Sequence, residues 1–223
     1  ASDGSPPPPP AAPAAIGQRQ IVPAASISLS GEVAHRRWAI FLTEAEAANA
    51  ESVQIAYQSS ILVAPEASSL RFIVNGQTVI DAPVASPEAV SEIAVAVPPN
   101  VLQAGLNTIA FEASMRHRTD CTVQSTYDLW TEIDGARSFV TFGDGAETRP
   151  RALEDVRAVG FDAEGLTRFN IAIAPETSVQ ASQSITRLSQ GLALLGATPN
   201  QVVTVTEGAP APTEAGSLSL LVG

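Results

Sequence analysis

The sequence has no lysine and few of the residues on which metal or nucleophilic chemistry usually depends. All 12 basic residues are arginine, and the 223 positions include one cysteine and two histidines. A single cysteine excludes an internal disulfide bond, and Cys121 is interpreted as a buried free thiol, with pairing to a cysteine outside this segment as the alternative. No run approaches the roughly 20 apolar residues of a membrane helix. The sequence contains no signal peptide, but a secreted protein has already lost its signal peptide in the mature form.

Positive charge is also scarce. The 23 acidic residues outnumber the basic ones and give a formal net charge of -11. Phosphate groups repel such a chain, so nucleic acid and anionic lipid are poor partners, whereas neutral polysaccharides meet no such penalty. Hydrophobic residues make up 45% of the sequence, which is enough for one large or two small domains with real cores.

Proline and alanine dominate the first 20 residues, which cannot pack into a core. We expect residues 1–20 to form a flexible, extended tether. An N-terminal segment of this kind is typical of a mature secreted or periplasmic protein. The alternative is that its proline motif binds another protein.

Alternating apolar and polar residues between positions 21 and 143 predict about nine short strands. Asn75-Gly76 between two apolar runs predicts a two-residue hairpin turn. Trp38 shares its face with Ile40 and Leu42, so we expect it in the core, and Thr43 to Ala50 is the one helical candidate. This spacing of strands and turns predicts an antiparallel jelly-roll sandwich. The expected strand segments are 26–30, 36–42, 53–57, 61–63, 70–74, 77–80, 91–97, 102–111, 127–134 and 138–142.

The pattern changes after Gly143. Residues 144–166 read as a linker with a short helical piece at Leu153 to Val156. Residues 167–223 then predict strand, helix and two more strands, the arrangement of a parallel sheet covered on both faces. Thr177 or Ser178 can begin the helix and Gly196 can end it. Because one face of this sheet would lack a helix, we expect the domain to continue beyond the segment. The apolar helix face comprises Ala181, Ile185, Leu188, Leu192 and Leu195.

The densest group of polar side chains lies between Arg116 and Asp134. As a strand, its second half places Tyr127, Leu129, Thr131 and Ile133 on one face, which resembles a core. The other face carries Asp128, Trp130, Glu132 and Asp134. A tryptophan among carboxylates can stack on a sugar ring while the acids accept its hydroxyl hydrogen bonds. The alternative is that a loop covers this face and Trp130 is a packing residue.

Catalysis is the weaker interpretation of these residues. Asp128 and Glu132 are separated by roughly 13 Å along a strand, more than the roughly 5–9.5 Å between the acids of a glycosidase. Glu132 and Asp134, at roughly 6.6 Å, are permitted by spacing alone. We therefore expect no enzymatic activity.

The preceding loop, Arg116-His117-Arg118-Thr119-Asp120-Cys121, has the residue types of a metal site or a Cys-His nucleophile. It lacks enough further ligands, since the only other histidine is His35. We expect a hydrogen-bonded loop with Asp120 as the arginine partner. Residues 174–178 lead into a helix N-terminus but lack glycines and carry Glu176, so no cofactor is expected there.

The R-H-R-T-D-C stretch followed by Y-D-L-W-T-E-I-D, after a jelly roll and before an α/β unit, resembles the periplasmic subunit of bacterial cellulose synthase. The resemblance implies alternating jelly-roll and flavodoxin-like domains beside a membrane anchor outside this segment. It implies a non-catalytic accessory role, in which the protein supports the membrane-embedded glucosyltransferase at the bacterial inner membrane and guides the nascent β-1,4-glucan (cellulose) chain during translocation. A purely structural docking module without direct sugar contact is the alternative.

Under this resemblance the chain divides at stated boundaries. Residues 1–20 are the tether, 21–143 the carbohydrate-binding-like jelly roll, 144–166 the linker and 167–223 part of a flavodoxin-like domain. The family belongs to a system regulated by cyclic di-GMP, a cytoplasmic ligand that the resemblance attaches to the catalytic partner.

Overall fold

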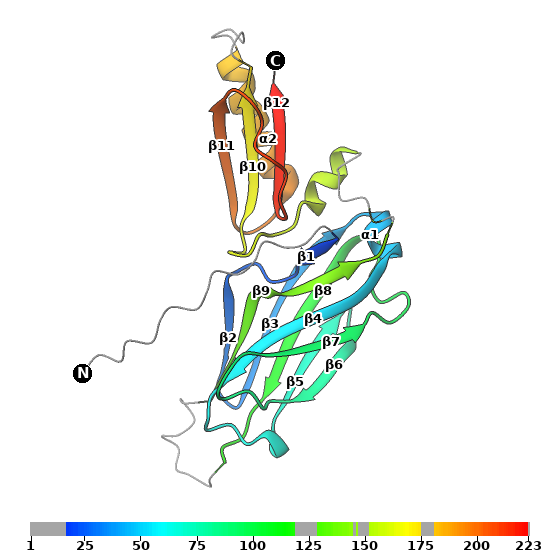
Figure 1. The fold of residues 1–223 in the computed structure, drawn as a ribbon, viewed down its shortest axis with the longest axis vertical. Helices are drawn as coiled ribbons and strands as arrows, with labels where there is room; N and C mark the ends of the chain where they lie inside the picture. The colour runs from blue at the N-terminus through cyan, green and yellow to red at the C-terminus, as the bar shows by residue number, and fades with distance from the viewer. Residues whose placement is uncertain (1–16, 119–128, 145, 147–151, 175–180, 223) are drawn as a thin grey trace, which may run out of the picture.

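Two antiparallel sheets packed face to face form the larger part of the protein (Figure 1). The computed structural model describes residues 17–118, 129–144, 146, 152–174 and 181–222, with backbone alone for residues 181 and 182. The first sheet contains β1 (Gln18–Gln20), β2 (Ser26–Ser30), β4 (Ala50–Ser59), β7 (Ser91–Ala96) and β9 (Trp130–Phe142). The second sheet contains β3 (Val33–Leu42), β5 (Ser69–Val74), β6 (Gln77–Pro83) and β8 (Gly105–Ser114).

The strand order is that of a jelly roll. The first sheet runs β2-β9-β4-β7, with β1 paired to the far half of β9, and the second runs β3-β8-β5-β6. Every pairing between these strands is antiparallel, and the chain crosses from sheet to sheet as two interleaved Greek keys. The predicted jelly-roll sandwich is therefore confirmed.

The inward faces of the two sheets meet in one apolar core. Trp38 packs against this core as predicted: its ring stacks on Phe111 with centroids 5.6 Å apart. Its Nε1 donates a hydrogen bond to the Ile21 carbonyl at 2.6 Å, so the indole nitrogen is satisfied at the sandwich edge. The largest fully buried core side chains are Phe72, Phe111, Ile21, Leu29, Leu42, Ile55, Leu70, Ile109, Met115, Leu129 and Ile133.

The predicted hairpin joins β5 and β6. Asn75 and Gly76 have φ values of 51° and 82°, the two positive values that a type I′ turn requires. The Asn75 side chain also anchors the neighbouring strand, because its Oδ1 accepts from the Thr108 amide at 2.8 Å. Its Nδ2 donates to Oδ1 of the buried Asn107, also at 2.8 Å, so the turn is held from two sides.

The helical candidate near residue 45 is a short helix, α1 (Glu44–Ala48). Thr43 and Glu46 form a reciprocal capping box. Glu46 is fully buried and also forms an ion pair with Arg19, a residue of β1. Burial lowers the pKa of the Arg19 guanidinium, and the charge and hydrogen bond of Glu46 act in the opposite direction. This pair fixes β1 to the helix.

Two strand predictions were wrong in detail. Residues 61–63 form a turn ending in an isolated bridge rather than a strand, and Ile61 is 66% exposed. The segments 127–134 and 138–142 are not separate strands, because β9 continues through both from Trp130 to Phe142. The register shifts opposite Ile55, where Gly135 passes so close to Ala24 that a Cβ would lie 2.0 Å from its carbonyl oxygen.

The remaining described elements form an α/β unit. It comprises the 3-10 helix η3 (Leu153–Ala158), β10 (Thr167–Ile173), α2 (Ala181–Gly196), β11 (Gln201–Glu207) and β12 (Ser217–Val222). The three strands are parallel in the order β11-β10-β12. As the periodicity predicts, Leu188, Leu192 and Leu195 pack with Phe169 and Ile171 of β10 in a second core. Among the described residues, α2 covers one face of this sheet, and positions 204–207 of β11 are exposed.

Helix α2 ends at the predicted glycine, but the reason differs from the one predicted. Gly196 is the last helical residue, but the left-handed conformation belongs to Ala197, whose φ is 50°. At Gly196 a Cβ would lie 2.9 Å from the Phe169 ring, so glycine is needed there for close packing of the helix on the sheet. The cap candidates Thr177 and Ser178 lie outside the described residues. In the part of the chain that is described, no helix combines the length and apolar character needed to cross a bilayer.

The α/β unit is packed against the end of the sandwich that carries β1, along a contact that we call the seam (Figure 1). Gln20 of β1 forms a backbone bridge with Phe161, and the Asn200 side chain donates to the Pro23 carbonyl at 3.0 Å. The Arg157 guanidinium lies 5.1 Å from the centroid of the Phe41 ring, as a cation–π contact.

Candidate functional site

The first half of β9 has one buried and one open face, as the alternation predicts. Leu129, Thr131 and Ile133 are completely buried. Thr131 Oγ1 lies 3.2 Å from the Met115 sulfur, so its hydroxyl has a contact within the core. On the opposite face Trp130 is half-buried and Glu132 is exposed. Tyr127 and Asp128, the other predicted members of these two faces, lie outside the described residues.

Neighbouring strands extend the open face with hydroxyl and amide groups. On β2, Ser30 lies opposite Trp130 and Ser28 opposite Glu132. On β4, Gln58 lies on the other side of Glu132. The hydroxyls of Ser28 and Ser30 are 3.1 Å apart and hydrogen-bonded. Because residues opposite each other in a sheet place their Cβ atoms about 4.5–5.5 Å apart, these side chains form one surface, which we call the β9 polar face.

Ser28, Ser30 and Gln58 were not predicted from the sequence as members of a site. The alternation of serine with Ile27 and Leu29 predicted a strand with a polar side. It contained no information about which strand lies beside β2, since β9 follows about 100 residues later in the chain.

Asp134, at the far end of the β9 polar face, is held by its own strand. Its Oδ1 accepts a hydrogen bond from the Arg137 amide at 3.1 Å, and its Oδ2 lies 3.7 Å from Arg137 Nε. These contacts fix the position of the Asp134 carboxylate, and no comparable contact holds Glu132 among the described residues. Glu132 is therefore the freer of the two acids.

Arg116, His117 and Arg118 lie at the same end of the sandwich as Trp130, connected to it through residues 60–63. The Ser60 amide donates to the Trp130 carbonyl at 2.9 Å. His117 forms a backbone bridge with Val63, and Arg118 Nε donates to the Val63 carbonyl at 3.0 Å. The structure thus brings the described part of the predicted loop close to the strand that carries Trp130.

Arg116 has a partner that was not predicted from the sequence. Its guanidinium forms an exposed ion pair with Glu32 at 2.8 Å, and its amide donates to Ser68 Oγ at 2.9 Å. Glu32 precedes β3 and is 84 residues away, so no local pattern marks this pairing. Asp120, the predicted partner, and Cys121 lie outside the described residues. Within those residues no cluster of three His, Cys, Asp or Glu side chains could hold a metal ion.

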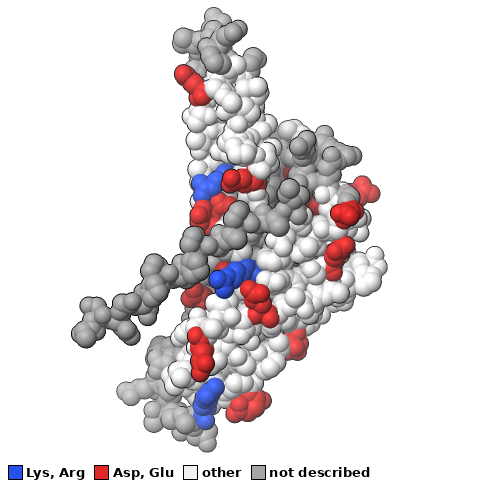
Figure 2. Space-filling model, viewed as in Figure 1, with Lys and Arg blue, Asp and Glu red and all other residues white. Residues whose placement is uncertain are grey.

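Acidic residues are spread over the visible surface of both parts of the molecule, and basic ones form a few small groups (Figure 2). This distribution agrees with 23 acidic residues against 12 arginines. At the β9 polar face acids and arginines occur together, since Asp134 pairs with Arg137 and Glu32 with Arg116.

Two antiparallel sheets in this strand order define the protein's larger domain as a jelly-roll β-sandwich, an architecture that lectin domains share. The chain belongs to the cellulose synthase BcsB family. The family model for "Cellulose synthase BcsB, first CBM domain" matches residues 14–144, which include both sheets and the β9 polar face.

Solved structures give weaker likenesses. A family 35 carbohydrate-binding module from an environmental isolate is 16% identical, with a TM-score of 0.35 over 57% of this chain and 93% of that one. Xylanase10C from Cellvibrio japonicus, in complex with xylopentaose, is 11% identical, with a TM-score of 0.33 over 73% of this chain and 31% of that one. A family two carbohydrate esterase from Clostridium thermocellum, in complex with cellohexaose, is 13% identical, with a TM-score of 0.27 over 82% of this chain and 47% of that one. Nothing about a binding site follows from likenesses at this level, and none of the curated proteins matches the chain.

Proposed function

We propose that the chain is a non-catalytic accessory module that contacts a β-1,4-glucan through the β9 polar face. Trp130 supplies the stacking surface for a sugar ring, and Glu132 accepts hydrogen bonds from its hydroxyls. From the sequence pattern we include Tyr127 and Asp128 in the proposed site, and the described Arg116, His117 and Arg118 lie at the same end of the sandwich.

One observation carries this proposal: Trp130 is partly exposed on an open sheet face whose other side is fully buried. A buried strand face fixes the backbone, so Trp130 is presented on a rigid support at little conformational cost. Its neighbours Ser30, Ser28 and Gln58 are neutral hydrogen-bonding groups. A flat aromatic ring beside hydroxyl, amide and carboxylate groups suits a neutral polyhydroxylated chain.

The wider biological role rests on the family. We propose that the module docks on the membrane-embedded glucosyltransferase of a cellulose synthase, on the periplasmic side of the bacterial inner membrane. The α/β unit is proposed to be the start of a flavodoxin-like domain, because its order β11-β10-β12 places the first strand between the second and the third, as flavodoxin-like sheets do. The domain boundaries at residues 20, 143 and 166 stay predictions.

Replacing Trp130 by alanine tests the sugar contact. We expect binding of cellotetraose, measured by titration calorimetry or NMR, to weaken by roughly fivefold or more, since an aromatic contact contributes about 1 kcal/mol. Trp130→Tyr keeps a stacking ring and should recover most of the affinity. The matched control is Val33→Ala, which truncates an exposed side chain of the second sheet.

The rival function, a docking module without sugar contact, predicts a different outcome. Ile61, at 66% exposure, and the partly exposed Leu62 lie beside Arg118, which gives this end of the sandwich a protein-binding character. If Trp130→Ala and Val33→Ala bind cellotetraose equally well, the β9 polar face is not a sugar site and the docking function replaces it.

A further inference from the structure

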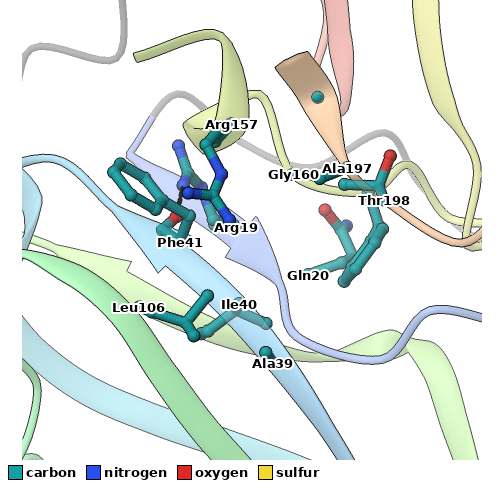
Figure 3. Close-up of a pocket in the computed structure, with 12 residues that line it drawn as sticks. Arg19, Gln20, Ala39, Ile40, Phe41, Leu106, Arg157, Gly160, Ala197 and Thr198 are labelled. Carbon is teal, nitrogen blue, oxygen red and sulfur yellow. Dashed lines mark hydrogen bonds between the residues drawn. The ribbon is translucent and has the colours of Figure 1, made fainter. Parts of the chain in front are cut away.

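A pocket lies on the seam and is lined by both parts of the chain (Figure 3). The sandwich contributes Gln20 of β1, residues 39–41 of β3 and Leu106 of β8. The α/β unit contributes Arg157, Phe161 and the residues that end α2. Its volume of about 50 Å³ corresponds to three or four water molecules, at roughly 10–15 Å³ for each.

Two buried polar atoms in this pocket have no hydrogen-bond partner. Gln20 is only 1% exposed, and its Oε1 is unpaired, as is Thr198 Oγ1. Only four buried polar side-chain atoms in the described part of the chain have no hydrogen-bond partner, and two of the four belong to residues that line this pocket. Buried polar atoms are almost always paired, so these two atoms mark a place where a small polar group can bind between the two parts. In Figure 3 the Gln20 amide extends from β1 toward Gly160, which follows η3, and Ala197, which follows α2.

The surrounding charges restrict the chemistry of that partner. Gln20 Oε1 accepts hydrogen bonds, and the pocket also meets the C-terminal end of α2, where unpaired carbonyl groups carry partial negative charge. Both features disfavour an anion beside Gln20, and Arg157, the lining cation, lies over the Phe41 ring instead. A cation would meet Arg157, and the charge of Arg19 is already balanced by Glu46. The ligand that fits is neutral and donates hydrogen bonds, as a hydroxyl group does.

The pocket rim adds an apolar surface. Leu106 is 61% exposed although its neighbours in β8 are largely covered, and it lies opposite Phe41 of β3 in the pocket lining. A mostly apolar lining with an exposed leucine and two unpaired polar atoms suits a molecule with a carbon skeleton on one side and hydroxyl groups on the other.

We propose that the seam pocket is a second carbohydrate site, which takes the hydroxyl-bearing end of a sugar. The sugar inserts a hydroxymethyl or vicinal diol group between Gln20 Oε1 and Thr198 Oγ1 and rests its C–H face on Leu106. The small volume excludes the passage of a chain, so the site recognises a chain end or a free monosaccharide rather than the interior of a polymer. The ligand bridges the sandwich and the α/β unit and stabilises the seam.

NMR titration of the isotopically labelled 223-residue chain with D-glucose and with cellotetraose tests this site. We expect saturable shifts of the Gln20 side-chain amide and the Leu106 methyl groups with both sugars. Thr198→Val, which replaces a hydroxyl by a methyl of the same size, should weaken binding at these signals by roughly five- to tenfold. Thr204→Val, at an exposed position of β11, is the matched control and should bind as the wild type.

The two sugar sites are distinguished by their own variants. Trp130→Ala should leave the seam signals unchanged, so its effect on cellotetraose reports on the β9 polar face alone. If cellotetraose shifts the seam signals and glucose does not, chain ends are the ligand; shifts with both sugars extend the site to free monosaccharides. No shift at Gln20 and Leu106 with either sugar, or equal binding by Thr198→Val and Thr204→Val, overturns the proposal and leaves the pocket to ordered water.

Discussion

Glu46 is a fully buried carboxylate that connects helix α1 to strand β1. One of its carboxylate oxygens accepts from the Thr43 amide at 2.8 Å and from Thr43 Oγ1 at 3.1 Å, and the other pairs with Arg19. Arg19 Nη1 also donates to the Phe41 carbonyl at 2.9 Å. A single buried carboxylate thus caps α1 and neutralises a buried guanidinium, and Arg19 in turn holds β1 against β3.

Removing the Glu46 charge should be costly. Glu46→Gln keeps the shape but leaves Arg19 buried without a counter-charge, a situation that typically costs about 3–5 kcal/mol of unfolding free energy. Glu44→Gln, in the same helix but exposed, is the matched control and should change stability by less than about 0.5 kcal/mol. Urea denaturation measures both. Similar values for the two variants would show that the ion pair contributes nothing net.

At the scale of elements, β9 changes its neighbouring strand partway along, and the β9 polar face ends at that point. Its first half pairs with β2 and its second half with β1, and the strand changes partner around Gly135. There the Ala56 amide donates to Ser138 Oγ at 3.1 Å, and the Gly135 amide donates to the Ala25 carbonyl at 2.8 Å. The irregularity is therefore held by specific hydrogen bonds on both sides.

Two glycine substitutions should act in opposite directions. At Gly135 a Cβ would lie 2.0 Å from the Ala24 carbonyl oxygen, so Gly135→Ala should destabilise the protein by about 1–3 kcal/mol through forced backbone movement. At Gly191, inside α2, a Cβ meets nothing within 4 Å, so Gly191→Ala should stabilise by about 0.5–1 kcal/mol. Chemical denaturation of both variants checks this. A neutral Gly135→Ala would mean that residues 24 and 25 move aside freely.

At the scale of the whole molecule, the seam decides whether the two parts behave as one body. Gly165, with φ of 76°, approaches the backbone of Ala24 so closely that a Cβ would lie 2.1 Å from its nitrogen. The turn that carries Gly165 is fixed by Asp162, whose Oδ1 accepts from the amides of Glu164 and Leu166, both at 2.9 Å. Arg168 pairs with Asp162 and Glu164, and hydrogen bonds to these acids raise the pKa of its guanidinium.

Gly165→Ala should separate the two parts without unfolding either one. The new Cβ pushes the turn away from residue 24, so we expect a larger radius of gyration in small-angle X-ray scattering. Faster proteolysis between residues 144 and 166 should accompany it. Gly208→Ala is the control: it carries a similar strain from a φ of 108°, but a Cβ there meets nothing within 4 Å. Scattering curves that coincide for the two variants would show that the seam does not depend on this contact.

Local patterns in the sequence determined much of this protein. The alternation in β9 identified which of its side chains are buried, because successive residues of a strand face opposite ways. Asn75-Gly76 determined its hairpin turn, and the spacing of Leu188, Leu192 and Leu195 determined the buried side of α2. These features depend on residues that are neighbours in the chain, so they can be inferred from order alone.

The tertiary structure alone decided the features that join distant segments. Arg19 meets Glu46, Arg116 meets Glu32, and Ser28, Ser30 and Gln58 complete the β9 polar face. The seam pocket combines residues of β1, β3, β8 and the end of α2. Each of these depends on the register and packing of elements far apart in sequence, which are set by the energy of the whole fold rather than by any local preference.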